Sequence, residues 1–231
     1  ETMSDSPETA SLISNEGAVR VLTLNRLAAL NAFTVAMLAQ TRAALAEAGE
    51  VYCAFVFDRE ILDALPSKRD RRVHFIRESL CELDAALQAK GGGLIVRHGR
   101  ATKEIPELAR KLGVAAVYAN RDYEPAAKRR DSTISTSLRD SGIAFRSFKD
   151  QAIFDRDEVL TLAGKPFSVF TPYKNAWLKR LTAADCAACE CYGSLTGREH
   201  AGVPSLDEIG FASTNLIGIG VQPGMSGART L

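Results

Sequence analysis

Two carboxylates near the middle of the chain, Asp122 and Glu124, directly follow an apolar stretch that ends near residue 119. Carboxylate oxygens can accept hydrogen bonds from the ring N–H or hydroxyl groups of a small ligand. Glu124 has a second explanation, because it precedes Pro125 at the predicted start of a helix. A negative charge there stabilises the helix dipole without any ligand. Both interpretations remain open at this point.

Phe55 and Asp58 come at the end of another apolar stretch. An aromatic ring and a carboxylate could flank a planar ligand, and the alternative is a core phenylalanine with an ordinary turn aspartate. Arg72 opens the next predicted helix and could bind a phosphate or a polyglutamate tail. The basic residues around it, from 68 to 72, favour instead a solvated basic surface.

Three cysteines, Cys186, Cys189 and Cys191, lie close together. A structural zinc ion takes four ligands, usually in two spaced pairs, and only His200 is near enough in sequence to be the fourth. We therefore interpret the cysteines as free thiols and expect no metal site. The chain has five cysteines without disulfide-like spacing, which favours a cytoplasmic location.

Alternating strands and helices are predicted to position these residues. The run from Val51 to Phe57 is almost entirely apolar, which is typical of a strand buried on both faces of a parallel sheet. Strands are predicted at 19–24, 51–57, 94–96, 114–119 and 143–148, and helices at 33–48, 70–90, 103–112 and 125–141. This order predicts an α/β fold with a five-stranded, doubly wound parallel sheet. Ligands in such sheets bind at the carboxyl ends of the strands, where Asp122 and Glu124 would lie.

The rest of the chain lacks this rhythm. Residues 1–15 are polar and acidic, and we expect a flexible leader there, followed by the α/β domain over 16–150. Residues 151–231 are rich in Gly, Pro, Ser and Thr, which predicts a long irregular wrapping segment with one or two short helices. Such a segment is too long for an ordinary loop, so we expect it to lead to a part that is absent.

Composition narrows the function further. The 231 residues carry a net charge of +1, so no strong field attracts nucleic acid and no direct DNA binding is expected. There is no run of 18 apolar residues that would predict a membrane helix. We expect one globular domain with a small-molecule ligand and no membrane partner.

From about residue 45 to residue 231, several segments in the right order resemble the N-terminal domain of the DNA photolyase and cryptochrome family. The most specific is Phe-Ser-Val-Phe-Thr-Pro-Tyr-Lys-Asn-Ala-Trp at 167–177. The others lie at 55–62, 67–83 and 118–131, with Gly210-Phe211 and Pro223-Gly224 near the end. The family's fold in this region is a Rossmann-like α/β domain, in agreement with the predicted elements.

The resemblance also implies a ligand, because this domain of the family binds an accessory antenna chromophore. Acidic residues that match Asp122 and Glu124 face the chromophore in the deazaflavin and flavin types, and Phe55, Asp58 and Arg72 complete the candidate set. Folate types tend to carry Asn and Glu where this chain has Ala126 and Ala127, so a deazaflavin or flavin is favoured over folate.

In the intact family, the antenna passes excitation energy to a catalytic FAD in a helical domain, which repairs pyrimidine dimers. That domain is expected to be missing here. We therefore expect no catalytic residues, no bound catalytic FAD and no repair by this chain alone, although it is related to deoxyribodipyrimidine photo-lyases.

Residues from about 12 to 42 resemble instead the start of the crotonase (enoyl-CoA hydratase) family, through segments 16–26 and 29–33. Residues 16–48 would then replace the photolyase's first strand and helix, and the chain would be a chimera. Two further hypotheses follow: a non-functional folded scaffold, whose imperfect sheet edge could pair in a homodimer, or an acyl-CoA-binding enzyme.

Overall fold

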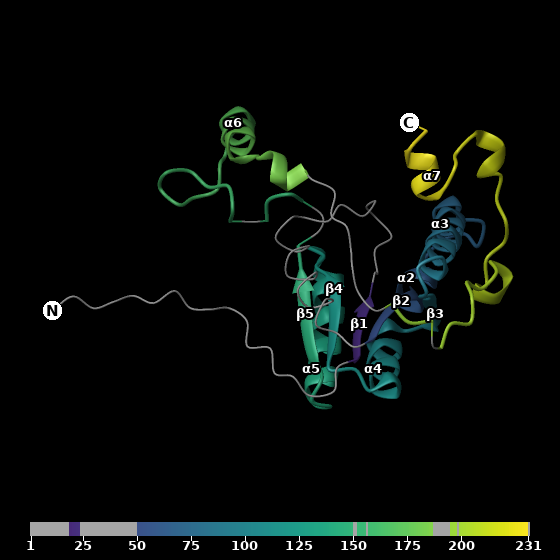
Figure 1. Ribbon diagram of the computed structural model, residues 1–231. Helices are drawn as coiled ribbons and strands as arrows, with labels where there is room; N and C mark the ends of the chain where they lie inside the picture. Colours follow the sequence, from purple (N-terminus) through teal and green to yellow (C-terminus); the bar gives the residue numbers. More distant parts are fainter. Residues whose placement is uncertain are drawn as a thin grey trace.

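The computed structural model describes residues 50–149, 152–155, 157–186, 195–197 and 199–230, together with the backbone of residues 19–23. These residues contain a five-stranded parallel sheet in the order β3-β2-β1-β4-β5 (Figure 1). Its strands are β1 (Val19–Thr23), β2 (Glu50–Asp58), β3 (Leu94–Gly99), β4 (Ala116–Asn120) and β5 (Ala144–Phe148). The predicted doubly wound parallel sheet is confirmed in this part of the chain. The predicted leader at 1–15 and helix at 33–48 lie outside the described residues.

Strand β1 lies inside the sheet, because it pairs with β2 on one side and with β4 on the other. It therefore presents no free edge to a second molecule. The homodimer expected from the sequence stays a prediction, but its contact would have to lie elsewhere than at β1.

In the described chain from β2 to β5, four helices connect the strands: α2 (Arg59–Leu62), α3 (Arg71–Gln88), α4 (Ala101–Leu112) and α5 (Pro125–Arg139). Local signals in the sequence define their ends. The side chain of Asp70 accepts a hydrogen bond from Arg72 N at 2.8 Å and caps α3. Gly113 ends α4 in the left-handed conformation, at φ 64°, which glycine adopts without steric penalty.

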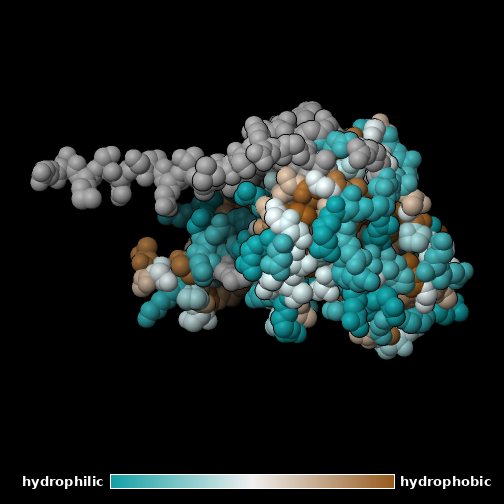
Figure 2. All heavy atoms as spheres, turned by 90° about the horizontal axis from the view of Figure 1, so that it is seen from below, coloured by the Kyte–Doolittle hydropathy of each residue, from teal (hydrophilic) through white to brown (hydrophobic). Residues whose placement is uncertain are grey.

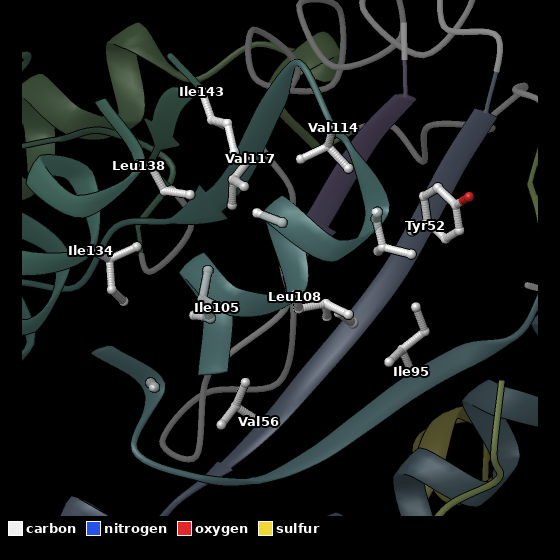
Figure 3. Packing of buried hydrophobic residues seen from close by; sticks show 14 residues of the cluster. Tyr52, Val56, Ile95, Ile105, Leu108, Val114, Val117, Ile134, Leu138 and Ile143 are labelled. Atoms are coloured by element: carbon white, nitrogen blue, oxygen red, sulfur yellow. The ribbon is translucent and has the colours of Figure 1, made fainter. Parts of the chain in front are cut away.

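The apolar run of β2 is explained by burial on both faces of the sheet. Tyr52, Ala54 and Val56 face α4 and α5, in the cluster drawn in Figure 3. The alternate residues of the same strand belong to a second cluster on the α3 side: Cys53, Phe55 and Phe57. Successive side chains of a strand point to opposite faces, so a strand buried on both faces must be apolar throughout.

The chain after residue 195 wraps over α3 and completes the second cluster. Leu206, Ile209 and Phe211 are buried against the α3 face of the sheet. This segment contains η2 (Asp207–Ile209), η3 (Ile217–Ile219) and α7 (Gly224–Ala228), shown in yellow beside α3 in Figure 1. The long irregular C-terminal segment expected from the sequence is present, and part of it belongs to the core.

The part of the chain after β5 lies beyond the carboxyl ends of β4 and β5 (Figure 1). It contains α6 (Phe170–Arg180) and the short η1 (Ala183–Cys186). Phe154 is buried here, with its ring centroid 5.4 Å from that of Trp177. No helix among the described residues is long and apolar enough to cross a membrane.

Candidate functional site

The connection between β4 and α5 lies at the topological switch point of the sheet. The strand order runs from β1 through β2 to β3 on one side and from β4 to β5 on the other, so β1 and β4 are the adjacent strands where the order reverses. In sheets of this kind, ligands bind beside the carboxyl ends of these two strands. Asp122 and Glu124 lie in this connection, which is the position predicted from the sequence.

The side chain of Asp122 organises the connection by binding backbone N–H groups of the two residues that follow it. Its Oδ1 accepts a hydrogen bond from Tyr123 N at 2.6 Å and a longer one from Glu124 N at 3.4 Å. Glu124 is exposed and is the N-cap residue of α5, but its side chain makes no capping hydrogen bond. Its charge still lies at the positive end of the helix dipole, so both interpretations of Glu124 are compatible with its position.

A mostly buried ion pair lies behind this connection, on the face of α5 that meets the sheet. Arg130 Nη2 is 2.8 Å from Asp131 Oδ1, and the two side chains are only 12% and 17% exposed. Burial raises the pKa of Asp131 above its ordinary value; the Arg130 guanidinium opposes this, and the charge of Asp122 adds to it. With Asn120 they line a small cavity of about 10 Å³, which is large enough for no more than one water molecule.

Sequence reasoning did not identify this ion pair, although a signal was present. Ala127, Ile134 and Leu138 form the buried stripe of α5. Arg130 lies four residues before Ile134, and Asp131 lies four residues after Ala127, so both must lie along that stripe. Charged residues on the buried face of a helix are unusual and deserve to be treated as candidate site residues.

A second polar network holds the connection from the other side. Asp155 lies between Arg121 and Tyr123: Arg121 Nη1 is 3.0 Å from Asp155 Oδ2, and the Tyr123 hydroxyl donates to Asp155 Oδ1 at 2.6 Å. Arg121 N also donates to Phe148 O at 2.7 Å, which joins the ends of β4 and β5. The backbone around Asp122 is thereby fixed by a residue more than 30 positions away in sequence.

Phe55 and Asp58 have structural surroundings. Phe55 is 4% exposed on the α3 side of the sheet, and its ring meets that of Phe57 edge-on at 5.1 Å. Asp58 is 1% exposed and accepts hydrogen bonds from Glu60 N at 3.1 Å and from Ala101 N at 3.3 Å. It therefore joins the end of β2 to the starts of α2 and α4. These positions agree with the alternative interpretation of a core ring and a structural aspartate.

Arg72 lies at the start of α3 with its side chain 67% exposed and turned back onto its own helix. Its Nη2 is 2.5 Å from Asp70 Oδ2, and hydrogen bonding from Arg72 lowers the pKa of Asp70. The structure thus brings Asp122 and Glu124 together at the switch point. Phe55, Asp58 and Arg72 belong instead to β2 and the chain that follows it, and β1 separates β2 from β4.

Among the residues whose side chains are described, no group of three or more His, Cys, Asp and Glu could hold a metal ion. The side chains of all three clustered cysteines, Cys186, Cys189 and Cys191, lie outside that part of the chain.

The sequence profile of the DNA photolyase family matches residues 28–190. This chain belongs to the DNA photolyase family. It is 32% identical over 168 residues to the deoxyribodipyrimidine photo-lyase of Halobacterium salinarum, which covers 71% of this chain and 34% of that protein. It is 30% identical over 146 residues to cryptochrome DASH of Natronomonas pharaonis, and this match covers 63% of this chain and 31% of that protein. The predicted resemblance to photolyases and cryptochromes is confirmed.

Solved structures agree on the fold. The class III photolyase of Agrobacterium tumefaciens superposes with a TM-score of 0.71 at 23% identity, over 96% of this chain and 45% of that one. The archaeal photolyase of Sulfolobus tokodaii, described as holding two FAD molecules, gives 0.64 at 25% identity, over 86% and 43%. The chain corresponds to the N-terminal α/β domain of the family, and it spans about a third to a half of the length of these relatives.

The predicted crotonase segment receives no support from these comparisons. The family match begins at residue 28, inside the stretch of 16–48 that was expected to be foreign. With it, the chimera and the acyl-CoA-binding enzyme lose their basis.

Proposed function

We propose that the chain binds an accessory light-absorbing chromophore, a deazaflavin or a flavin, at the carboxyl edge between β1 and β4. The observation that carries this proposal is the position of Asp122 and Glu124. They lie together at the switch point, in a domain whose family includes light-driven enzymes and blue-light receptors by name. When bound, such a chromophore would supply absorption of near-ultraviolet and blue light.

The chemistry of the two carboxylates fits a flavin-type ring. Such a ring offers an N–H donor on its pyrimidine edge and hydroxyl donors on its sugar-alcohol chain, and carboxylates accept from both. Asp155 contacts the side chains of Arg121 and Tyr123, on either side of Asp122, and so fixes this part of the chain before a ligand binds. Binding therefore loses less conformational entropy. Ala126 and Ala127 offer a pterin no hydrogen-bonding side chain, which keeps folate the less favoured chromophore.

A flavin is also supported by a relative. The photolyase of Sulfolobus tokodaii is described as containing two FAD molecules and as implying a novel light-harvesting cofactor. That description concerns the archaeal protein, but its α/β domain has the same fold as this chain. We infer the same class of ligand here.

We further propose that the physiological partner is the helical FAD-binding domain that accounts for the remaining length of the photolyases. The exposed apolar side chains of α6 and the residue before it support this: Val169, Phe170, Tyr173 and Leu178 are between 38% and 73% exposed. By contrast, hydrophilic residues predominate among the coloured residues of the face seen from below in Figure 2. An apolar group on one helix is typical of a surface that another domain covers. Repair of DNA would require that second domain and its FAD.

An absorbance and fluorescence titration of the purified chain tests the proposed ligand. A deazaflavin, FMN, FAD and a reduced folate are added in turn, and a shifted absorption band reports binding. We expect Asp122→Asn with Glu124→Gln to weaken deazaflavin or flavin binding by about tenfold or more, since each carboxylate bond contributes about 1.5 to 3 kcal/mol.

Matched controls use the same substitutions away from the site. The control variants are Asp140→Asn, at the opposite end of α5, and Glu107→Gln, on the exposed face of α4. Both should bind as the unmodified chain does. Binding of folate alone, or equal binding by the site and control variants, would overturn the proposal.

A further inference from the structure

A hollow of about 570 Å³ lies on the α3 side of the molecule, away from the β4–α5 connection. It forms where the chain leading into α3 meets the C-terminal segment. Its lining comes from both parts of the chain: Ser67, Arg69, Asp70, Arg71, Thr214 and Asn215. None of these residues belongs to the proposed chromophore site.

Hydrogen bonds between the two parts fix the shape of this hollow. Ala212 N donates to Lys68 O at 2.8 Å, and Arg71 Nε donates to Asn215 Oδ1 at 2.9 Å. His74 Nδ1 lies 2.9 Å from the Thr214 hydroxyl and accepts from Thr214 N at 3.3 Å. The hollow is therefore bounded by segments about 140 residues apart that hold each other in place.

The charge inside the hollow is positive and largely uncompensated. Among the described residues, neither Arg69 nor Arg71 forms an ion pair: Arg71 contacts the neutral Asn215, and only the backbone of Arg69 is hydrogen-bonded, to the Ser67 hydroxyl. The carboxylate in the lining, Asp70, is already paired with Arg72 at 2.5 Å. Asp70 also caps α3, so its negative charge lies at the helix N-terminus. The guanidinium groups of Arg69 and Arg71 therefore remain able to bind an anion from solution.

We propose that this hollow binds the phosphate group of a small molecule of about mononucleotide size. Guanidinium groups match the geometry of phosphate oxygens, and the hydroxyl of Ser67 and the amide of Asn215 add neutral donors. The volume of the hollow is far larger than a phosphate ion needs and lies in the range of ordinary ligand pockets. The phosphate is therefore part of a larger molecule.

Calorimetric titration of the full chain with AMP tests this proposal. Adenosine is the comparison ligand, because it is the same nucleoside without the phosphate group. We expect AMP to bind and adenosine to bind at least about tenfold more weakly, because the charged contacts carry the affinity. Arg69→Gln with Arg71→Gln should abolish the preference for AMP. Arg129→Gln with Arg139→Gln removes the same charge from the exposed face of α5 and should preserve it.

Arg69→Glu alone is a second test that should not disturb folding, because the Arg69 side chain forms no hydrogen bond or ion pair with the described part of the chain. This substitution should also abolish AMP binding. Asp122→Asn should leave AMP binding intact, which separates this site from the proposed chromophore site. Equal binding of AMP and adenosine would overturn the proposal. So would unchanged AMP binding in Arg69→Glu, or binding only of a single-stranded oligonucleotide.

Discussion

Asp84 on α3 joins three parts of the chain through one buried carboxylate. Its Oδ1 accepts a hydrogen bond from Leu94 N at 2.9 Å, and its Oδ2 accepts one from Gln88 Nε2 at 2.9 Å and lies 2.9 Å from His200 Nε2. Leu94 begins β3, and His200 belongs to the C-terminal segment, where its ring lies against Gly93. The carboxylate thus positions the helix, the strand and the wrapping segment together.

Replacing Asp84 tests this role. Asp84→Ala leaves the buried Leu94 N–H without an acceptor, so the free energy of unfolding should fall by about 2 to 3 kcal/mol. Asp84→Asn keeps an acceptor oxygen for Leu94 N and should lose only about 1 kcal/mol. Urea denaturation of both variants measures the difference. Equal losses in the two variants would show that the contact with Leu94 contributes little.

The same residue predicts a dependence on pH. Burial alone would raise the pKa of Asp84, but hydrogen bonds from His200 and Leu94 N outweigh it and hold the pKa below its ordinary value. The folded state then binds fewer protons than the unfolded state, so this stabilisation is complete above the unfolded pKa of about 4 and disappears as the pH falls through the lowered value.

Denaturation of the unmodified chain and of Asp84→Asn over a series of pH values measures this effect. The gap in unfolding free energy between the two proteins should be constant near neutral pH. It should narrow once the pH falls below about 4. A gap that stays constant into the acid range would contradict the assignment.

At the scale of elements, α7 is docked on α3 by a small set of contacts. Glu82 on α3 accepts hydrogen bonds from Ser226 N at 2.9 Å and from its hydroxyl at 2.5 Å. Gly224 N donates to Ser79 Oγ at 3.0 Å. Gly227 is buried, and a side chain there would collide with the backbone carbonyl of Gln222.

Gly227→Ala should therefore open α7 without unfolding the sheet. We expect faster amide hydrogen exchange over residues 222–230 and unchanged exchange in α4 and α5, because local opening requires less free energy than global unfolding. Gly218→Ala is the matched control, since a methyl group there meets open space. Slow exchange over 222–230 in the Gly227 variant would mean that the turn adapts to the added methyl group.

The elements differ in how far sequence could predict them. β2 to β5 and the helices α3, α4 and α5 were predicted because each carries a local signal, such as the apolar run of β2 or the stop at Gly113. The single turn of α2 was not predicted. The packing of Leu206 and Phe211 against α3 could not be predicted, since it depends on contacts distant in sequence and follows no period. The same holds at the site. The alternation of strands and helices along the chain predicted that Asp122 and Glu124 lie at the carboxyl edge of the sheet, but the contacts of Asp155 exist only in the folded chain.

At the scale of the whole molecule, the C-terminal segment is part of the core. Phe211 belongs to the residues that cover α3, and its side chain is 3% exposed. Lys68 Nζ lies 4.6 Å from the centre of the Phe211 ring. Phe170 on α6 is the contrasting case, at 73% exposed.

Phe211→Ala should lower the free energy of unfolding by about 3 to 5 kcal/mol, which is the usual loss for a buried phenylalanine. Phe170→Ala removes the same atoms from the surface and should change it by less than about 0.5 kcal/mol. Urea denaturation of the two variants checks the comparison. Equal stability of both variants would show that the wrapping segment adds little to the core.

The most direct measurement of the central claim is a map of amide chemical shifts in the ¹⁵N-labelled chain while a deazaflavin or flavin is added. The proposed site predicts the largest changes at residues 120–124 and at the start of α5, with none at Gly113 and Gly142 on the amino edge of the sheet. Changes confined to the amino edge, or no changes with any chromophore, would contradict a chromophore site between β1 and β4.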